Sequence, residues 1–196
     1  MRSEIVLIGP PFAGKSTLGK LLAEELGLPQ LSLDTLRWDY YREIGFDEAL
    51  AQELRQKGGF WAVVAYWCLF NSHAIERALA DHTDCIFDLG GGPIVFENDL
   101  QRDQIKRALA PFANVARLLP SPDPEKSIQI LQQRGSHLIG VNGQGFNWSA
   151  FFVNHQHNQA LAKYTVYTEG KTPAASCAEI IALTQTTSQV KISEAT

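Results

Sequence analysis

A lysine and two hydroxyl side chains stand together near the amino terminus, at the end of a stretch rich in glycine and proline. The stretch reads GPPFAGKST and fits the spacing G-x-x-x-x-G-K-[ST], with Gly9, Gly14, Lys15 and Ser16 at the fixed positions. Glycine at these positions lets backbone N–H groups turn inward on phosphate oxygens, because no Cβ blocks the approach. Lys15 suits the β- and γ-phosphates of a nucleotide, Ser16 a magnesium ion, and Thr17 the α-phosphate. The spacing predicts a P-loop that binds a nucleotide, with a plain helix-capping glycine turn as the alternative.

Every residue of this loop is a candidate for contact with the nucleotide. The candidates are Gly9, Pro10, Pro11, Phe12, Ala13, Gly14, Lys15, Ser16 and Thr17. The run IVLIG before the loop is apolar and β-branched, as expected of a central parallel strand. Leucines after the loop keep helical spacing up to Gly27, so the positive end of a helix dipole points at the phosphates.

An aspartate and three glycines close a second apolar run, CIFDLGGG. Asp88, at the carboxyl end of a strand beside the P-loop strand, is placed to hold Mg²⁺ through water, or alternatively to cap a turn. Gly90, Gly91 and Gly92 either bring backbone N–H groups to a small acceptor substrate or form a sharp turn. Both interpretations stay open from the sequence.

A second aspartate follows the short run LSL, at the edge of the sheet where α/β proteins bind ligands. Asp34 can accept or orient the proton of an attacking hydroxyl, and it is also a good helix N-cap. Arg37, three residues later, would pair an anionic group of an acceptor or lie in solvent as a surface arginine.

The elements that position these residues alternate along the chain. Strands are expected at Ile5–Gly9, Leu31–Leu33, Cys85–Leu89, Val115–Leu119 and Tyr164–Thr168. Helical spacing joins Ile105, Ala108, Leu109 and Phe112, and Thr172-Pro173 begins a last helix. The alternation predicts right-handed βαβ crossovers and a parallel sheet with helices on both faces, an α/β fold.

Composition narrows the function classes. The chain has 196 residues, of which 45% are hydrophobic, and this composition suits one compact domain. We place the domain at residues 1–185, with a glycine-rich lid at about 135–150. Residues 186–196 are expected to form a flexible tail. A net charge of −4 argues against nucleic-acid or anionic-membrane partners. Three cysteines without CxxC spacing and no room for a signal peptide favour the cytoplasm. The apolar run 60–70 predicts a buried helix or a subunit contact, hence a monomer or homodimer.

The order of motifs resembles shikimate kinase and its P-loop kinase relatives over roughly residues 4 to 185. The motifs are GPPFAGKST, SLDT, GGG before VFEND, LQQR before the lid, and LAKYTVYT. The resemblance implies a three-layer P-loop fold with a five-stranded parallel sheet, strand order 2-3-1-4-5, ATP with Mg²⁺, and a lid that closes over the phosphates. It also implies that Asp34 contacts the acceptor hydroxyl, that Gly90–Gly92 lie against the acceptor, and that Arg134 meets the nucleotide phosphates.

Departures from the family pattern concern the acceptor. The family's D-x-D stands here as Ser32-Leu33-Asp34, Trp61 lies near the place of a carboxylate-binding arginine, and the stretch 135–149 contains no Arg or Lys. Because bidentate arginine clamps bind carboxylates strongly, their loss argues for an acceptor other than shikimate. We expect a kinase that transfers phosphate from ATP to a hydroxyl of a small molecule, using Lys15, Asp34 and Arg134. A nucleotide-binding NTPase or switch, or a kinase fold kept as a binding module, remains the alternative.

Overall fold

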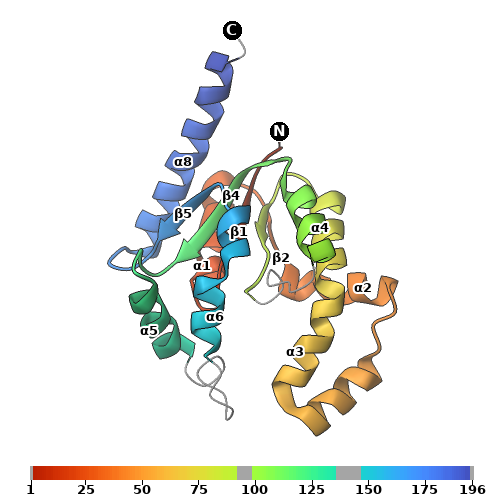
Figure 1. The fold of residues 1–196 in the computed structure, drawn as a ribbon. Helices are drawn as coiled ribbons and strands as arrows, with labels where there is room; N and C mark the ends of the chain where they lie inside the picture. The colour runs from red at the N-terminus through yellow and green to blue at the C-terminus, as the bar shows by residue number, and fades with distance from the viewer. Residues whose placement is uncertain (1, 92–98, 136–146, 195–196) are drawn as a thin grey trace.

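The computed structural model describes residues 2–91, 99–135 and 147–194, and its centre is a twisted parallel sheet (Figure 1). The strands are β1 (Arg2–Ile8), β2 (Gln30–Ser32), β3 (Ile86–Asp88), β4 (Phe112–Leu119) and β5 (Tyr164–Tyr167). Their order across the five-stranded sheet is β2-β3-β1-β4-β5, and every pair is parallel. The predicted α/β fold and the predicted strand order are confirmed.

Helices cover both faces of the sheet. They are α1 (Lys15–Leu26), α2 (Leu33–Glu43), α3 (Glu48–Asp81), α4 (Asp99–Leu109), α5 (Pro124–Gly135), α6 (Trp148–Asn154), α7 (Gln156–Leu161) and α8 (Pro173–Glu194). Side chains of β1 alternate between the two faces, as the period of a strand requires. Val6 and Ile8 belong to the core that includes residues of α2, α3 and α4, whereas Ile5 and Leu7 pack with residues of α1, α5 and α8. The central strand is therefore buried on both sides.

Two residues lie in a different kind of element from the one predicted. Phe112 was expected on a helix but is the first residue of β4, since α4 ends at Leu109. Pro111 has no backbone N–H and disfavours helical angles at the residue before it, which explains the end of α4. Leu33 was expected in the second strand but is the first residue of α2.

The long helix α3 is bent in its first half. Gly59 has φ 76° and ψ −169°, which lie outside helical geometry, and the bend is visible in Figure 1. A left-handed φ of this kind is accessible to glycine at little cost. Phe60 and Trp61 follow the bend directly, and both line a cavity that the P-loop also borders.

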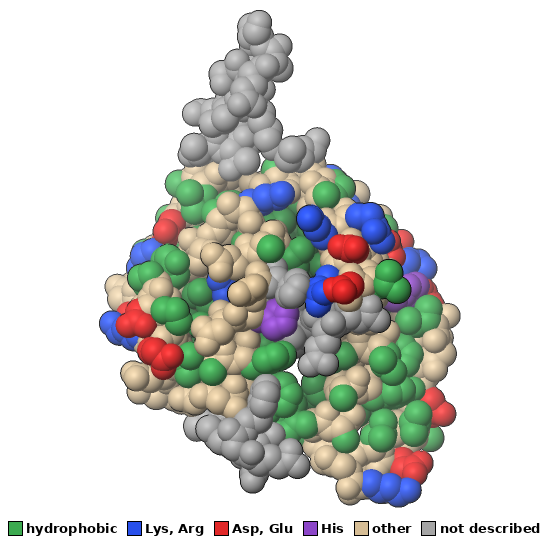
Figure 2. All heavy atoms as spheres, viewed as in Figure 1, with side chains coloured by type: hydrophobic (Ala, Val, Ile, Leu, Met, Phe, Trp, Pro, Cys, Tyr) green, Lys and Arg blue, Asp and Glu red, His purple; other side chains and the backbone are tan. Residues whose placement is uncertain are grey.

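The predicted apolar run 60–70 is part of α3. Val63 and Phe70 are buried in the core, whereas Leu69 is 63% exposed. Figure 2 shows hydrophobic side chains at the surface over the lobe formed by α2 and α3. Whether this surface contacts a second copy stays a prediction.

The remaining predictions on organisation concern the lid and the carboxyl end. Residues 136–146 of the expected lid lie outside the described part of the chain, and its last residues begin α6. Helix α8 continues to Glu194, so residues 186–194 are helical, and their separation from the domain as a tail stays a prediction. Within residues 2–91, 99–135 and 147–194, no helix combines the length and apolar character needed to cross a membrane.

Candidate active site

The loop between β1 and α1 contains three residues with positive φ. Gly9 has φ 138° and Gly14 has φ 99°. A Cβ on Gly9 would lie 2.5 Å from the carbonyl oxygen of Leu118 on β4, so only glycine fits there. Phe12 has φ 63°, a left-handed conformation that costs free energy for a residue with a side chain and that occurs mostly where function needs it. The loop is therefore shaped by constraints beyond the connection of a strand to a helix.

Lys15 is buried inside this loop. Its side chain donates from Nζ to the carbonyl oxygens of Gly9, at 3.0 Å, and Pro10, at 2.8 Å, and the residue is only 6% exposed. Burial lowers the pKa of Lys15, while the nearby charges of Asp88 and Asp34 act in the opposite direction. Phosphate oxygens are stronger acceptors for an ammonium group than neutral carbonyls. A bound phosphate would thus replace the two loop carbonyls as partners of Lys15.

Ser16 and Asp88 meet beside Lys15. The Ser16 hydroxyl donates to Asp88 Oδ2 at 2.7 Å, and the backbone N–H of Gly90 donates to Asp88 Oδ1 at 3.0 Å. Asp88 is 1% exposed and ends β3, in register with Leu7 of the P-loop strand. The two roles that the sequence left open for Asp88, turn cap and metal-site carboxylate, are compatible in this geometry.

A hydroxyl and a carboxylate so arranged fit Mg²⁺, which prefers hard oxygen ligands and keeps several waters and phosphate oxygens. Among the described residues, no group of three or more His, Cys, Asp or Glu side chains forms a metal cage. A magnesium ion at Ser16 and Asp88 would therefore take most of its ligands from a nucleotide and from water.

The turn after β3 packs directly on the P-loop. A Cβ on Gly91 would lie 2.4 Å from the backbone nitrogen of Pro11, so a side chain there would push the two loops apart. Gly90 and Gly91 also line the cavity described next, while Gly92 lies outside the described residues. The glycines thus combine a tight turn with a position at the cavity.

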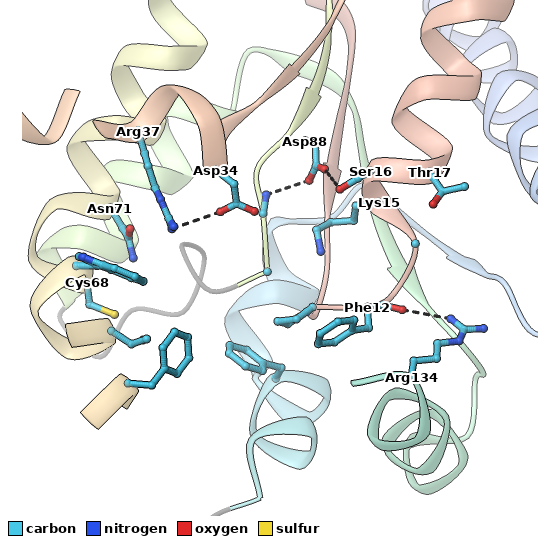
Figure 3. Close-up of a pocket in the computed structure, with 18 of the residues that line it drawn as sticks. Phe12, Lys15, Ser16, Thr17, Asp34, Arg37, Cys68, Asn71, Asp88 and Arg134 are labelled. Carbon is cyan, nitrogen blue, oxygen red and sulfur yellow. Dashed lines mark hydrogen bonds and ion pairs between the residues drawn. The ribbon is translucent and has the colours of Figure 1, made fainter. Parts of the chain in front are cut away.

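A cavity of about 570 Å³ opens between the P-loop and the lobe formed by α2 and α3 (Figure 3). Asp34, Arg37 and Asn71 lie on one side and Phe12 and Arg134 on the other, with Lys15 between them. The rest of the lining includes Pro11, Gly14, Ser16, Thr17, Phe60, Trp61, Val64, Trp67, Cys68, Asp88, Gly90, Gly91 and Phe152. One cavity thus joins the predicted nucleotide site to the predicted acceptor residues.

Asp34 and Arg37 face each other across one turn of α2. Arg37 Nη1 lies 3.3 Å from Asp34 Oδ1, and the Asp34 side chain is 56% exposed. The N-cap position of α2 belongs to Ser32, so the interpretation of Asp34 as the helix cap is wrong and its carboxylate is open to a ligand.

Arg37 is held between two indole rings rather than in solvent. Its guanidinium carbon lies 4.6 Å from the ring centroid of Trp38 and 4.9 Å from that of Trp67, and the side chain is 15% exposed. Cation–π contacts of this kind restrain an arginine. The interpretation of Arg37 as a solvated surface arginine is therefore wrong.

Arg134 stands at the opposite end of the P-loop. It lies in the last turn of α5 and donates from Nη1 to the carbonyl oxygen of Phe12 at 3.3 Å. A second cavity of about 160 Å³ begins beside it and is lined by residues that include Thr17, Thr168 and Lys171. Lys15 and Arg134 therefore place two cations along the loop that is expected to hold the phosphates.

Several residues that line the larger cavity were not predicted from the sequence as site residues. Asn71 and Cys68 lie on one face of α3 with Val64 and Trp67, at spacings of three and four residues. That spacing was a usable signal, because side chains three or four apart share a face of a helix. The contact between Trp61 and Trp148 had no signal, since it joins α3 to α6; the two indoles stack with centroids 3.6 Å apart and an interplanar angle of 10°.

Comparisons with known proteins find relatives that are named as shikimate kinases. No family model matches the chain. The shikimate kinase of Streptomyces coelicolor is 31% identical over 171 residues, which cover 86% of this chain and 88% of that protein. The shikimate kinase of Salinispora arenicola is 28% identical over 182 residues, with 91% of this chain and 95% of that protein covered.

The structural comparison supports the same fold. Shikimate kinase from Acinetobacter baumannii, solved in complex with shikimate, matches with a TM-score of 0.64 and 20% identity, covering 95% of this chain and 94% of the other. Together with the P-loop geometry, these relatives show that the chain belongs to the shikimate kinase family and is built as a small-molecule P-loop kinase.

Proposed function

We propose that the protein is an ATP-dependent phosphotransferase that moves the γ-phosphate to a hydroxyl of a small-molecule acceptor other than shikimate, with Mg²⁺ as cofactor. The observation that carries the proposal is the shared cavity, into which both the P-loop and Asp34 open. A nucleotide and an acceptor bound there would bring their reacting atoms together, as phosphoryl transfer requires.

The P-loop end of the cavity supplies the nucleotide contacts. Backbone N–H groups of the loop and the amino end of α1 would bind phosphate oxygens, with Lys15 and Arg134 balancing their charge. Ser16 and Asp88 would hold the magnesium ion, which supplies charge neutralisation at the phosphates when bound. The smaller cavity beside Arg134, Thr168 and Lys171 is the place we assign to the base.

Asp34 provides the contact for the acceptor. The acceptor hydroxyl would donate to the Asp34 carboxylate, which positions the hydroxyl oxygen for attack on the γ-phosphorus. The new O–P bond forms as the bond from the γ-phosphorus to the β,γ-bridging oxygen breaks, the hydroxyl proton passes to Asp34, and ADP leaves. Gly90, Gly91 and Arg37 border the same space.

Three features support an acceptor other than shikimate. The first carboxylate of the D-x-D pattern is replaced by Ser32, and Trp61 lines the cavity near the place expected for a carboxylate-binding arginine. The stretch 135–149 contains no Arg or Lys. The relatives named as shikimate kinases therefore define the reaction class of this proposal and not its acceptor.

The test is ADP release from Mg·ATP with and without a panel of hydroxylated acceptors that includes shikimate, gluconate and nucleosides. Stimulation by an acceptor, with transfer of label from [γ-³²P]ATP to that acceptor, is the expected result. A slow release that no acceptor changes would instead favour a nucleotide-dependent switch or NTPase. ATP binding without any turnover would favour a binding module.

The proposal includes a cytoplasmic location, because three free cysteines suit a reducing compartment.

A further inference from the structure

The half of the cavity beyond Asp34 has aromatic walls. Phe60, Trp61, Val64 and Trp67 line it from α3, and Phe152 lines it from α6. Flat apolar walls favour ligands with a ring, because stacking adds to the burial of apolar area. The bend at Gly59 directly precedes this wall, since it separates the first third of α3 from the longer part that carries these side chains.

Two buried donors on this side lack a hydrogen-bond partner. Arg37 Nε and Trp67 Nε1 are both inaccessible to solvent and unpaired among the described residues, and both side chains line the cavity. A buried donor without a partner costs free energy, so a ligand oxygen is favoured where a small turn of the side chain brings the donor to the cavity. Asn71 stands next to them; its amide oxygen accepts from the Tyr41 hydroxyl, which leaves its NH₂ group to donate.

The charges on this side already cancel. Of the cations that line the cavity, Lys15 and Arg134 contact the P-loop, and Arg37 is paired with Asp34. The segments 92–98 and 136–146, which the structure does not describe, contain no lysine or arginine. An anionic group on an acceptor would therefore find no cation at this end that lacks a counter-charge, and burial of an unpaired charge is costly.

We propose that the acceptor is an uncharged alcohol built on a flat or unsaturated ring, with a second oxygen that accepts hydrogen bonds from Arg37 and Trp67. This inference rests on the proposed function and specifies its acceptor. The ring lies against Trp61, Trp67 and Phe152, and the reacting hydroxyl meets Asp34. The second oxygen is a carbonyl, ether or hydroxyl rather than a carboxylate or phosphate.

Matched pairs of ligands that share a ring and a hydroxyl, with one anionic and one uncharged member, test this assignment. Suitable pairs are shikimate and its methyl ester, adenosine and adenosine 3′-monophosphate, and 4-(hydroxymethyl)benzoate and its methyl ester. Each is titrated by calorimetry without ATP and then assayed for ADP release with Mg·ATP. The uncharged member is expected to bind about tenfold more tightly or better, and to support the larger kcat/KM. Equal or tighter binding of the anionic members, or binding of neither member of any pair, would overturn the inference.

Two variants sharpen the test. Trp67→Phe keeps an aromatic ring, although a smaller one, and removes the Nε1 donor, so the affinity for the uncharged ligand should fall about three- to tenfold with ATP affinity unchanged. Leu69→Ala, on the same helix but exposed and outside the cavity lining, is the control and should change neither affinity. Val64→Lys adds a cation to the wall and should shift preference toward the anionic members; an unchanged preference would contradict the charge argument.

Failure of the proposed function is distinguishable from failure of this inference. Titration of the wild-type protein with Mg·ATP tests the nucleotide site directly, and absence of binding there would defeat the kinase assignment. The titrations of the shikimate and hydroxymethylbenzoate pairs without ATP still give their own answer, because these ligands carry no nucleotide base, and the adenosine pair is titrated with the nucleotide site filled by Mg·ADP.

Discussion

The hydroxyl of Ser16 donates a hydrogen bond to the carboxylate of Asp88, and this 2.7 Å contact ties the start of α1 to the end of β3. The two side chains come from positions 72 residues apart in the sequence. Mg²⁺ prefers oxygen ligands and binds carboxylates directly or through water. We therefore expect Ser16 and Asp88 to determine how much Mg²⁺ the protein needs for activity.

Asp88→Asn should therefore raise the Mg²⁺ concentration needed for half-maximal activity. The neutral amide keeps the size of the side chain but removes its charge, and an increase of about tenfold or more is expected, as for other residues that support a metal through its ligands. Titration of activity with Mg²⁺ at fixed ATP measures the shift. Asp103→Asn, exposed on α4, is the control. An unchanged Mg²⁺ requirement in Asp88→Asn would remove Asp88 from the metal site.

Lys15→Ala should abolish measurable binding of Mg·ATP. The substitution removes the charge that faces the β- and γ-phosphates and leaves the loop carbonyls of Gly9 and Pro10 pointing at the same space. Calorimetry with Mg·ATP makes the measurement, and Lys20→Ala, exposed on α1, should bind normally. Wild-type affinity in Lys15→Ala would refute the P-loop assignment.

Asp34→Asn should retain ATP binding and lose phosphoryl transfer. Removal of a positioned proton acceptor lowers rates by about 10²- to 10⁴-fold. Single-turnover transfer of labelled phosphate measures the step itself, and ATP affinity is checked in the same preparation. Asp39→Asn on the exposed side of α2 serves as the matched control. A transfer rate close to wild type would exclude Asp34 from the reaction.

The buried charge of Lys15 should also make stability depend on pH. Burial lowers the pKa of Lys15 below its ordinary value of 10.5. Between the lowered pKa and 10.5 the unfolded chain binds more protons than the folded one, so the free energy of unfolding rises with pH in that window. Below the window the folded protein bears the full cost of the buried ammonium.

Lys15→Met removes this titration and should be more stable than wild type at neutral pH without nucleotide. The difference in unfolding free energy between the two proteins should shrink as the pH rises toward 10.5, because the folded-state lysine has then lost its proton while the unfolded-state lysine is only beginning to lose its own. Urea unfolding from pH 7 to 10.5 measures the trend. A difference that stays constant across this range would show that Lys15 titrates normally in the folded state.

Much of the site was predictable because its residues are close in sequence or lie at strand ends. The P-loop is contiguous, so spacing alone identifies Lys15 and Ser16. Asp88 and Asp34 end apolar runs, and the carboxyl ends of parallel strands share one edge of the sheet. Those placements follow from local pattern and from the general geometry of α/β folds.

The missed features depend on contacts between distant elements. The burial of Arg37 requires Trp67 from α3, and nothing on α2 alone indicates that a second indole covers it. The end of α4 was misplaced because helical spacing continues formally to Phe112, although Pro111 was a visible stop signal. The bend at Gly59 was likewise marked by the glycine pair Gly58-Gly59, whose effect depends on how the two halves of α3 pack.

The stack of Trp61 on Trp148 belongs to a cluster of tryptophans that places the intrinsic fluorescence of the protein at the cavity. The chain has four tryptophans, and all of them gather around the acceptor half of the cavity. Trp61 and Trp67 line it, Trp148 stacks on Trp61, and Trp38 packs edge-on against Trp67. Intrinsic tryptophan emission therefore originates around one wall of the cavity, so the unlabelled protein carries a reporter for any ligand that binds against that wall.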